Sequence, residues 1–361
     1  MTSTTARNAT VLIAVVAMGV VFHWMRDILT PLVLALFLLI MIDGLARAVQ
    51  RYVKVSDKAA MPAAIVLIIL AFVGSVWVIV DGAAGFFAQA EGVSARLNVV
   101  IADLGGLMGL PAVPTVEQLV ERFEVGKYAG NVALAVQGVA SDAFFVLVYL
   151  GFLIASRAGF RQKTQSLFPD AKDRSEADEV FTRIRDGVEG YLWVQTVTGA
   201  MIAVACWLLM LAMGLENAAF WAFVIFILSY IPIIGGAIAG LAPPLFALVQ
   251  FDTYWPPLIL FVGIQVILFV VGNLILPRMQ GENQNIDPVV VLLSLAFWGA
   301  LWGVTGMFLS TPLTVMAMAI LTEFKSTRWI AVLLSGDGEP YPRTPEQHAR
   351  KAEKTHGGVS V

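Results

Sequence analysis

Charged side chains are scarce in this 361-residue sequence, in which Asp, Glu, Lys and Arg make up 14% of the residues and hydrophobic residues 58%. An ordinary soluble domain has about 25% charged residues. Between Gly190 and Thr322 the charged residues are Glu216, Asp252, Arg278, Glu282 and Asp287. So few charges argue against a soluble globular protein and indicate that lipid is the solvent of this region.

Cysteine and histidine are also rare, with one cysteine, Cys206, and three histidines that lie far apart in the sequence. A single thiol excludes a disulfide framework, and no set of these residues has the spacing of metal ligands. The net charge of −3 provides no basic field for nucleic acid. We therefore expect no metal, no cofactor and no nucleic-acid partner.

Catalytic motifs are missing from the apolar segments as well. They contain neither a G-x-S-x-G nucleophile turn nor an H-E-x-x-H metal motif, and the chain has no phosphate-binding P-loop. Ser310 and Thr311 precede Pro312, where hydroxyls serve as local backbone partners at a helix break. The sequence therefore predicts no catalytic residues and a protein that is not an enzyme.

Long uncharged runs are what the sequence does contain. A helix needs about 20 residues to cross the roughly 30 Å of hydrocarbon in a bilayer. The runs cover residues 8 to 25, 28 to 42, 59 to 80, about 139 to 156, 190 to 215, 217 to 251, 253 to 277 and 288 to 322. They predict an all-α polytopic membrane protein with about eight transmembrane helices.

The distribution of Lys and Arg between the runs predicts the orientation, because cytoplasmic loops collect these residues. Residues 43 to 58, 157 to 189 and the tail after 322 are rich in them, which predicts cytoplasmic N- and C-termini. The predicted regions are 1–80 with spans one to three, an extracytoplasmic amphipathic segment at 81–138, span four with a cytoplasmic amphipathic helix at 139–189, a transport core at 190–322 and a disordered polar tail at 323–361.

The run from 217 to 251 is too long for one span, since its 35 residues would form a straight helix of about 52 Å. Pro232, followed by Gly235 and Gly236, favours a break, because proline lacks an amide hydrogen and glycine is a poor helix former. Pro243 and Pro244 predict a further interruption. We expect the sixth span to end near Pro232 and residues 233 to 250 to form a re-entrant hairpin or broken half-helices.

The last run has a related pattern. The segment from Trp302-Gly303 to Pro312-Leu313 lies 68 residues after that from Ile234-Gly235 to Pro244-Leu245. Corresponding Gly and Pro interruptions in two segments indicate a transporter site. Chance in a chain with 31 glycines explains the match equally well.

Polar residues within the apolar runs are the remaining site candidates. Asn273 and Gln265, two turns apart, could bind a solute or ion, although an interhelical amide hydrogen bond is the favoured interpretation of Asn273. Arg278 follows Pro277 at the end of a run, and either a snorkelling interfacial role or a contact with an anionic or oxygen-rich solute fits it. The pathway candidates are Pro232, Gly235, Gly236, Pro243, Pro244, Gln265, Asn273, Pro277, Arg278, Gly303, Gly306 and Pro312.

Three segments of the apolar C-terminal half resemble a known family. They are residues 230–236 (YIPIIGG), 272–278 (GNLILPR) and 287–295 (DPVVVLLSL), the last followed by Gly303, Gly306 and Pro312. In order and spacing they resemble the signature of the autoinducer-2 exporter family over residues 190 to 322, with a looser match in the N-terminal spans. The resemblance implies a secondary transporter of the bacterial inner membrane, assembled as a homo-oligomer in the lipid bilayer.

The resemblance also implies what is transported. Members are associated with export of the quorum-sensing furanone signal, and others with extrusion of sodium or lithium in exchange for protons. Many relatives have His where this chain has Asp287, so Asp287 and Glu282 are candidates for proton or ion coupling. The leading hypothesis is proton-linked export of a small polar solute. The alternatives are a sodium or lithium/proton antiporter, and a channel or envelope scaffold.

Overall fold

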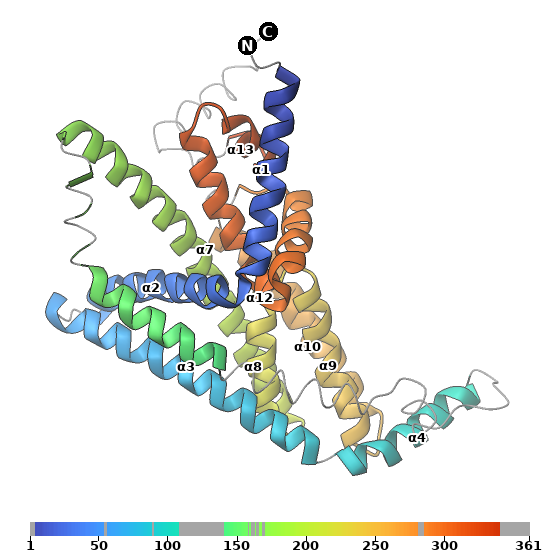
Figure 1. Cartoon of the computed structure of the whole chain (residues 1–361). Helices are drawn as coiled ribbons and strands as arrows, with labels where there is room; N and C mark the ends of the chain where they lie inside the picture. Colours follow the sequence, from blue (N-terminus) through green and yellow to red (C-terminus); the bar gives the residue numbers. More distant parts are fainter. Residues whose placement is uncertain are drawn as a thin grey trace, which may run out of the picture. The chain divides into compact units, whose positions relative to one another are not determined.

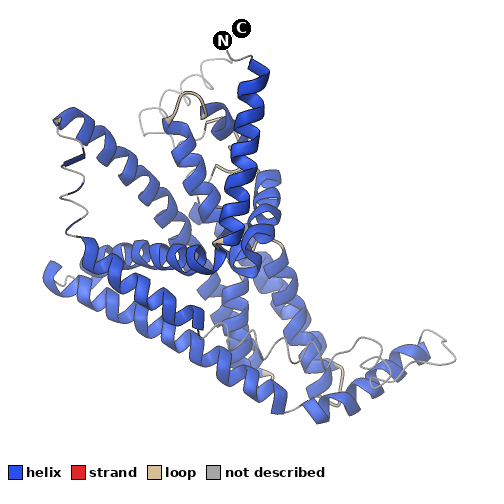
Figure 2. Cartoon of the chain, in the orientation of Figure 1, coloured by secondary structure: helices blue, strands red, loops and turns tan. Residues whose placement is uncertain are grey.

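The computed structural model describes residues 4–53, 56–88, 90–107, 141–157, 170–280 and 285–339, with isolated positions between 159 and 167. Nearly all of these residues are helical (Figure 2). Five helices among them are long and apolar enough to cross a membrane, and three shorter apolar helices accompany them. The prediction of an all-α polytopic membrane protein is confirmed.

The chain forms two compact units, which are described separately below. The first contains Met1–Arg157 and Gln195–Leu274, and the second contains Ala158–Val194 and Ile275–Val361 (Figure 1). Helix α7 (Ala171–Ala212) contributes its first half to the second unit and its second half to the first. It joins the predicted cytoplasmic amphipathic segment to the predicted fifth span in one continuous helix.

The first unit begins with α1 (Thr4–Trp24), α2 (Arg26–Val53) and α3 (Asp57–Ala88). Helix α2 packs against α3 and against a helix at residues 141–157. Alanines at the contact allow the helices to approach closely, as is usual where lipid supplies no hydrophobic drive for association. The buried residues of this cluster are Ala35, Ile42, Ala46, Ala64, Val146 and Leu150.

An ion pair lies at the end of this helix packing. Arg157 Nη2 donates to Asp43 Oδ2, and Arg157 Nη1 lies 3.5 Å from Met61 Sδ. The Asp43 side chain is 13% exposed and the Arg157 side chain 38%, so the pair joins α2, α3 and the 141–157 helix in a partly buried place. The ion pair is not predicted, because the sequence cannot show which cation lies opposite Asp43.

Helix α4 (Ala90–Leu107) contributes two polar contacts near the start of α10 (Trp255–Val270). Arg96 Nη2 donates to the carbonyl oxygen of Phe251 at 3.0 Å, and the Tyr254 hydroxyl donates to Asp103. The hydrogen bond to the Asp103 carboxylate raises the pKa of Tyr254 above its usual value. Residues 108–140, including most of the predicted outer amphipathic segment, lie outside the described residues.

A helical hairpin follows α7, formed by α8 (Ala218–Leu228) and α9 (Ile234–Gln250). Gln250 closes its base: Nε2 donates to the Gly214 carbonyl at 2.9 Å, and Oε1 accepts from the Glu216 amide at 2.8 Å. Because the end of α9 is bonded to the residues before α8, the hairpin returns to the side from which it starts. The prediction that a sixth span ends near Pro232 is corrected, since α8 has 11 residues and is about 16 Å long.

Helix α9 also corrects the prediction of a second break. It runs without interruption through Pro243 and Pro244, both of which are buried. A membrane helix tolerates proline when neighbouring helices and side chains satisfy the freed backbone groups, and Ala239 and Gly240, four residues earlier, leave room for the rings. The break near Pro232 is present; the one at Pro243 and Pro244 is not.

The second unit contains α11 (Leu276–Gln280), α12 (Pro288–Glu323) and α13 (Arg328–Leu334). Helix α12 is interrupted at Gly303, whose φ of 63° and ψ of −142° are not helical. Trp298 Nε1 lies 3.2 Å from Thr314 Oγ1, although a straight helix would separate these positions by about 24 Å. The run predicted as one span is therefore a second hairpin with its tip at Gly303.

The base of this second hairpin is bonded to the segment after α13. The Asp287 amide donates to the Leu334 carbonyl at 3.2 Å, and Ile286 forms a β-bridge with Ser335. Asn285 Nδ2 donates to the Glu339 carbonyl at 2.8 Å. Part of the tail predicted to be disordered from residue 323 is thus ordered; residues 340–361 lie outside the described residues.

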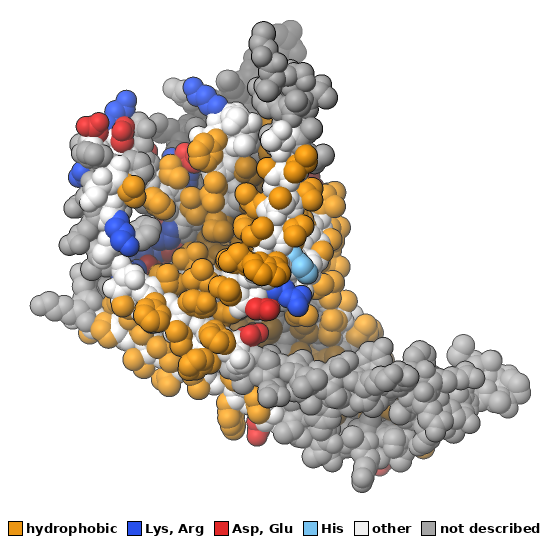
Figure 3. All heavy atoms as spheres, viewed as in Figure 1, with side chains coloured by type: hydrophobic (Ala, Val, Ile, Leu, Met, Phe, Trp, Pro, Cys, Tyr) orange, Lys and Arg blue, Asp and Glu red, His pale blue; other side chains and the backbone are white. Residues whose placement is uncertain are grey.

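The exposed surface of the described residues is largely hydrophobic. Figure 3 shows hydrophobic side chains covering most of the described part of one face. Exposed examples are Val66 at 55%, Trp77 at 66% and Phe152 at 68%. Monomeric soluble proteins rarely expose contiguous apolar patches of more than a few hundred square ångströms, so this surface fits contact with lipid.

Candidate functional site

A groove of about 710 Å³ lies beside the tip of the α8–α9 hairpin, in the first unit. The tip contributes Ile233, Gly236 and Ala237. The opposite wall consists of residues on or just after α10, namely Phe261, Val262, Gln265, Val266, Leu268, Phe269 and Asn273. An apolar wall with a few polar groups is the usual build of a small-molecule site.

The tip has a strained backbone. Ile233 has a φ of 63° and a ψ of −60°, and the Ile234 amide donates to the Pro232 carbonyl at 2.6 Å. These are the dihedrals and the hydrogen bond of a γ-turn of the rare type, which β-branched residues seldom adopt. Strain of this kind persists only where the surrounding structure enforces it, and it concentrates at functional sites.

Gly235 allows the two arms to meet directly after this turn. A Cβ atom at Gly235 would lie 1.7 Å from the Leu228 carbonyl oxygen, whereas one at Gly236 would meet nothing within 4 Å. The two neighbouring glycines therefore have different roles. Gly235 is required for packing, and Gly236 leaves its part of the groove open.

Gln265 is the polar group best placed in the groove. A Cβ atom at Gly240 would lie 2.7 Å from Gln265 Oε1, so glycine at this position makes room for the amide between α9 and α10. Gln265 and Asn273 both line the groove, as their spacing predicts. Gly240 is not a predicted site residue, because its role depends on a side chain of another helix.

Asn273 has a local bond in addition to its place in the groove. It lies in η1 (Val271–Ile275), a turn of π-helix, and its Nδ2 donates to the Phe269 carbonyl at 3.1 Å. The amide thus bonds its own helix rather than a neighbouring one. Single π-turns within α-helices occur frequently at functional sites.

Two residues of α7 that the sequence analysis does not select hold the hairpin tip. Gln195 Nε2 donates to the Ser229 carbonyl at 2.6 Å, and the hydroxyls of Thr196 and Tyr230 lie 2.6 Å apart. The available signal is that both are polar residues in an apolar run. Their partners lie 34 residues away, which sequence spacing does not reveal.

The second hairpin places Gly303 at its tip and Gly306 at the contact between its arms. A Cβ atom at Gly306 would lie 1.9 Å from the Trp298 carbonyl oxygen. Pro312 is buried in the second arm beside Ser310 and Thr311. Among the described residues Thr311 Oγ1 has no hydrogen-bond partner. These candidates belong to the second unit, while those of the groove belong to the first.

The remaining candidates also lie in the second unit. Asp287 is the N-cap of α12, and its Oδ1 accepts from the Val289 amide at 2.7 Å. A carboxylate at this position stabilises a helix start, which is a structural role. Pro277 and Arg278 are exposed in α11. Glu282 lies outside the described residues.

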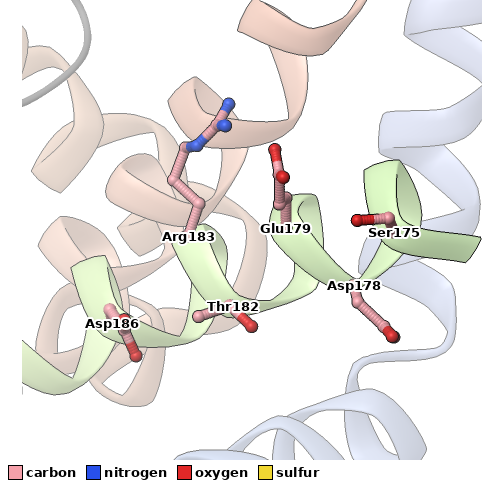
Figure 4. Close-up of a pocket in the computed structure, with 6 residues that line it drawn as sticks. All are labelled: Ser175, Asp178, Glu179, Thr182, Arg183 and Asp186. Atoms are coloured by element: carbon pink, nitrogen blue, oxygen red, sulfur yellow. The ribbon is translucent and has the colours of Figure 1, made fainter. Parts of the chain in front are cut away.

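A hollow of about 490 Å³ lies along the exposed polar face of α7. Figure 4 shows its side chains projecting from successive turns of this one helix in different directions. Arg183 is paired with Glu323 at 2.7 Å, and Arg185 with Asp186 at 3.1 Å. The hollow is thus a charged helix surface without converging ligands. In the described part of the chain no group of three His, Cys, Asp or Glu residues could hold a metal ion.

Comparison with known proteins gives one family match. A protein-family profile described as AI-2E family transporter matches residues 12–326. A Haemophilus influenzae protein is 30% identical over 322 residues, which are 87% of this chain and 92% of that protein. Its assignment to transport rests on its name alone.

Two Escherichia coli K12 proteins are similar as well. YhhT, likewise assigned to transport by name alone, is 27% identical over 329 residues, 90% of this chain and 92% of YhhT. The AI-2 transport protein TqsA is 30% identical over 205 residues. That match covers 57% of this chain and 58% of TqsA.

Proposed function

Because the chain belongs to the AI-2E family of transporters, we propose that it exports a small polar solute through a secondary, proton-linked mechanism. It is a multi-pass membrane protein, and the proposal places it in the bacterial inner membrane with both termini in the cytoplasm. The proposal also includes assembly into a homo-oligomer, which rests on the family resemblance. The quorum-sensing furanone is the candidate solute, because TqsA is named as an AI-2 transport protein.

The groove at the hairpin tip is the observation that carries the proposal. It combines apolar walls with the amides of Gln265 and Asn273. Helix α9 starts at the same place, but its Ile234, Gly235 and Ala237 amides already donate to backbone carbonyls of the turn, so the donors that the groove offers are the two side-chain amides. A neutral, oxygen-rich solute can accept hydrogen bonds from these groups. None of the described residues that line the groove has an ionisable side chain, which favours such a solute over a bare cation.

The topology of the first unit supports the same proposal. The α8–α9 hairpin starts and ends on the same side. The number of complete membrane crossings therefore differs from the number expected if every apolar run were a simple span. Irregular backbone at membrane depth, such as the Pro232–Ile234 turn, is tolerated where it is covered by protein or lines a water-filled cavity. A solute pathway beside the tip provides such a cavity.

Gln265→Ala is expected to lower furanone export about tenfold, because a solute group buried in the groove would lose its hydrogen-bond partner. The measurement is efflux from proteoliposomes with an imposed proton gradient. Leu258→Ala is the matched control, since Leu258 is an exposed residue of α10 that does not line the groove. Equal efflux from both variants would reject the groove as the pathway. Proton-gradient-driven sodium or lithium flux without furanone flux would favour the antiporter instead.

Asn273→Ala and Arg278→Ala are expected to lower export while membrane insertion and assembly remain unchanged. For Asn273 the local bond to Phe269 predicts an accompanying loss of thermal stability of about 1 kcal/mol. Efflux and thermal unfolding of the same purified variants give both quantities. Unchanged efflux would assign both residues purely structural roles.

A further inference from the structure

The hairpin tip is bonded to α7 through residues that are not among those lining the groove. Gln195 and Thr196 are consecutive polar residues of α7, and each bonds one of two consecutive tip residues, Ser229 and Tyr230. Ser229 follows directly on the end of α8, where the last carbonyls have no partner within the helix. The Gln195 amide thus satisfies a backbone carbonyl that would otherwise have to face an apolar environment.

The packing around these bonds is close. A Cβ atom at Gly199, one turn after Gln195, would lie 2.4 Å from Ser229 Oγ. Ser229 Oγ donates to the Phe226 carbonyl at 2.7 Å, and the Phe226 ring meets Tyr230 edge-on with centroids 5.7 Å apart. The tip is therefore seated closely against α7.

The same tip borders the groove through Ile233 and Gly236. Ile233 has the strained γ-turn backbone, which would relax if the tip were free to move. The seat on α7 thus holds a strained loop in place. It does so with two side-chain hydrogen bonds that contact no part of the groove.

We propose that Gln195 and Thr196 are positioning residues that hold the hairpin tip in place beside the groove, and that release of their hydrogen bonds lets the tip move and changes the shape of the groove. Hydrogen bonds between membrane helices are weak enough to break reversibly, because the released groups find other partners. The inference rests on the proposed function only in that the groove is the solute pathway. The movement of the tip itself can be tested without a solute.

A thiol introduced by Gly236→Cys reports the position of the tip. A side chain at this position meets nothing within 4 Å, and Cys206 is the one native cysteine and is buried, so Cys206→Ala provides a thiol-free background. The measurement is the rate of modification by a water-soluble maleimide in purified protein. Thr196→Val and Tyr230→Phe are each expected to raise this rate about three- to tenfold, the population change expected for one such bond.

Comparison of the labelling rates of several variants separates a positioning role from general destabilisation. Thr196→Val with Tyr230→Phe should have no more effect than the larger single change, because both remove the same bond. Thr196→Ser keeps a hydroxyl and should react at the unmodified rate. Thr198→Val is the matched control, since the Thr198 hydroxyl bonds the Gln195 carbonyl of its own helix at 3.4 Å.

Equal labelling rates in Thr196→Val, Tyr230→Phe and the reporter protein would overturn the inference. So would an equal acceleration by Thr198→Val, which would mean that loosening of α7 alone exposes the thiol. If Thr196→Val fails to fold, Gln195→Leu tests the other bond with the same expected acceleration. Because no solute is present, a failed export assay would leave these labelling results and their meaning unchanged.

Discussion

Gly235→Ala is expected to prevent formation of the folded protein, whereas Gly236→Ala leaves it intact. The added methyl group at Gly235 would lie 1.7 Å from the Leu228 carbonyl oxygen, which is backbone and cannot rotate away. Relief would require separating α8 from α9 at the strained turn. Overpacking of a core usually costs about 1 to 3 kcal/mol, and a clash with backbone in a tight hairpin should exceed that range.

The measurement is the yield of monodisperse protein in detergent together with its thermal unfolding temperature. Gly236→Ala provides the control, because it makes the same chemical change one residue later in open space. A Gly235→Ala protein that matches Gly236→Ala in yield and unfolding temperature would refute the close approach of the two arms. Gly235→Leu should be at least as damaging as Gly235→Ala.

Arg157→Met is expected to destabilise the protein by about 2 kcal/mol. Removal of one partner of a buried ion pair usually costs about 3 to 5 kcal/mol, because the other charge stays buried. The Arg157 side chain is 38% exposed, and solvent screening reduces the loss. Asp43, at 13% exposure, would keep a carboxylate whose Oδ1 has no hydrogen-bond partner among the described residues.

A double variant tests the cause of that loss. Asp43→Leu combined with Arg157→Met removes both charges, and it should regain most of the stability because an apolar pair suits this packing. Arg185→Met is the matched control, since Arg185 pairs with Asp186 on the exposed face of α7 and should change stability by less than about 1 kcal/mol. Chemical unfolding of the four proteins measures the differences. A double variant no more stable than Arg157→Met would show that the lost attraction between the two charges, not the stranded carboxylate, is decisive.

The two interruptions predicted for the run from 217 to 251 have different outcomes in the structure. The prediction of a break near Pro232 is confirmed, because a missing amide hydrogen and two glycines act locally. The prediction of another break at Pro243 and Pro244 is wrong, because α9 continues through them. Whether proline ends a membrane helix depends on the neighbours that satisfy the freed carbonyls, and these neighbours come from distant parts of the chain.

The 68-residue offset between the two Gly and Pro patterns differs from the offset between the corresponding residues of the two hairpins. Both segments do form hairpins, yet the residues with positive φ, Ile233 and Gly303, are 70 positions apart. The glycines at the arm contacts, Gly235 and Gly306, are 71 apart. The sequence match thus identifies two related local structures in the wrong register, because glycine serves either for a turn or for a close contact.

Some residues of the candidate site are predictable from the sequence and others are not. Gln265 and Asn273 lie in one groove as helical spacing predicts, because their separation along a single helix decides which face they share. Gln195, Thr196 and Gly240 are not predicted, since each acts on a residue of another helix. The placement of Arg278, Asp287 and the second hairpin relative to the groove remains a prediction.

Composition and the length of the uncharged runs are sufficient to establish an all-α membrane protein, because the cost of placing charges and unpaired backbone in hydrocarbon acts on each segment separately. The motifs at 230–236, 272–278 and 287–295 are sufficient for the family, since they are contiguous in sequence. The tertiary structure alone decides which residues of the two interrupted runs pair as hairpin arms, that Asp43 meets Arg157 and that α7 holds the tip. Each of these depends on contacts between residues 16 to 114 positions apart, which local preferences do not encode.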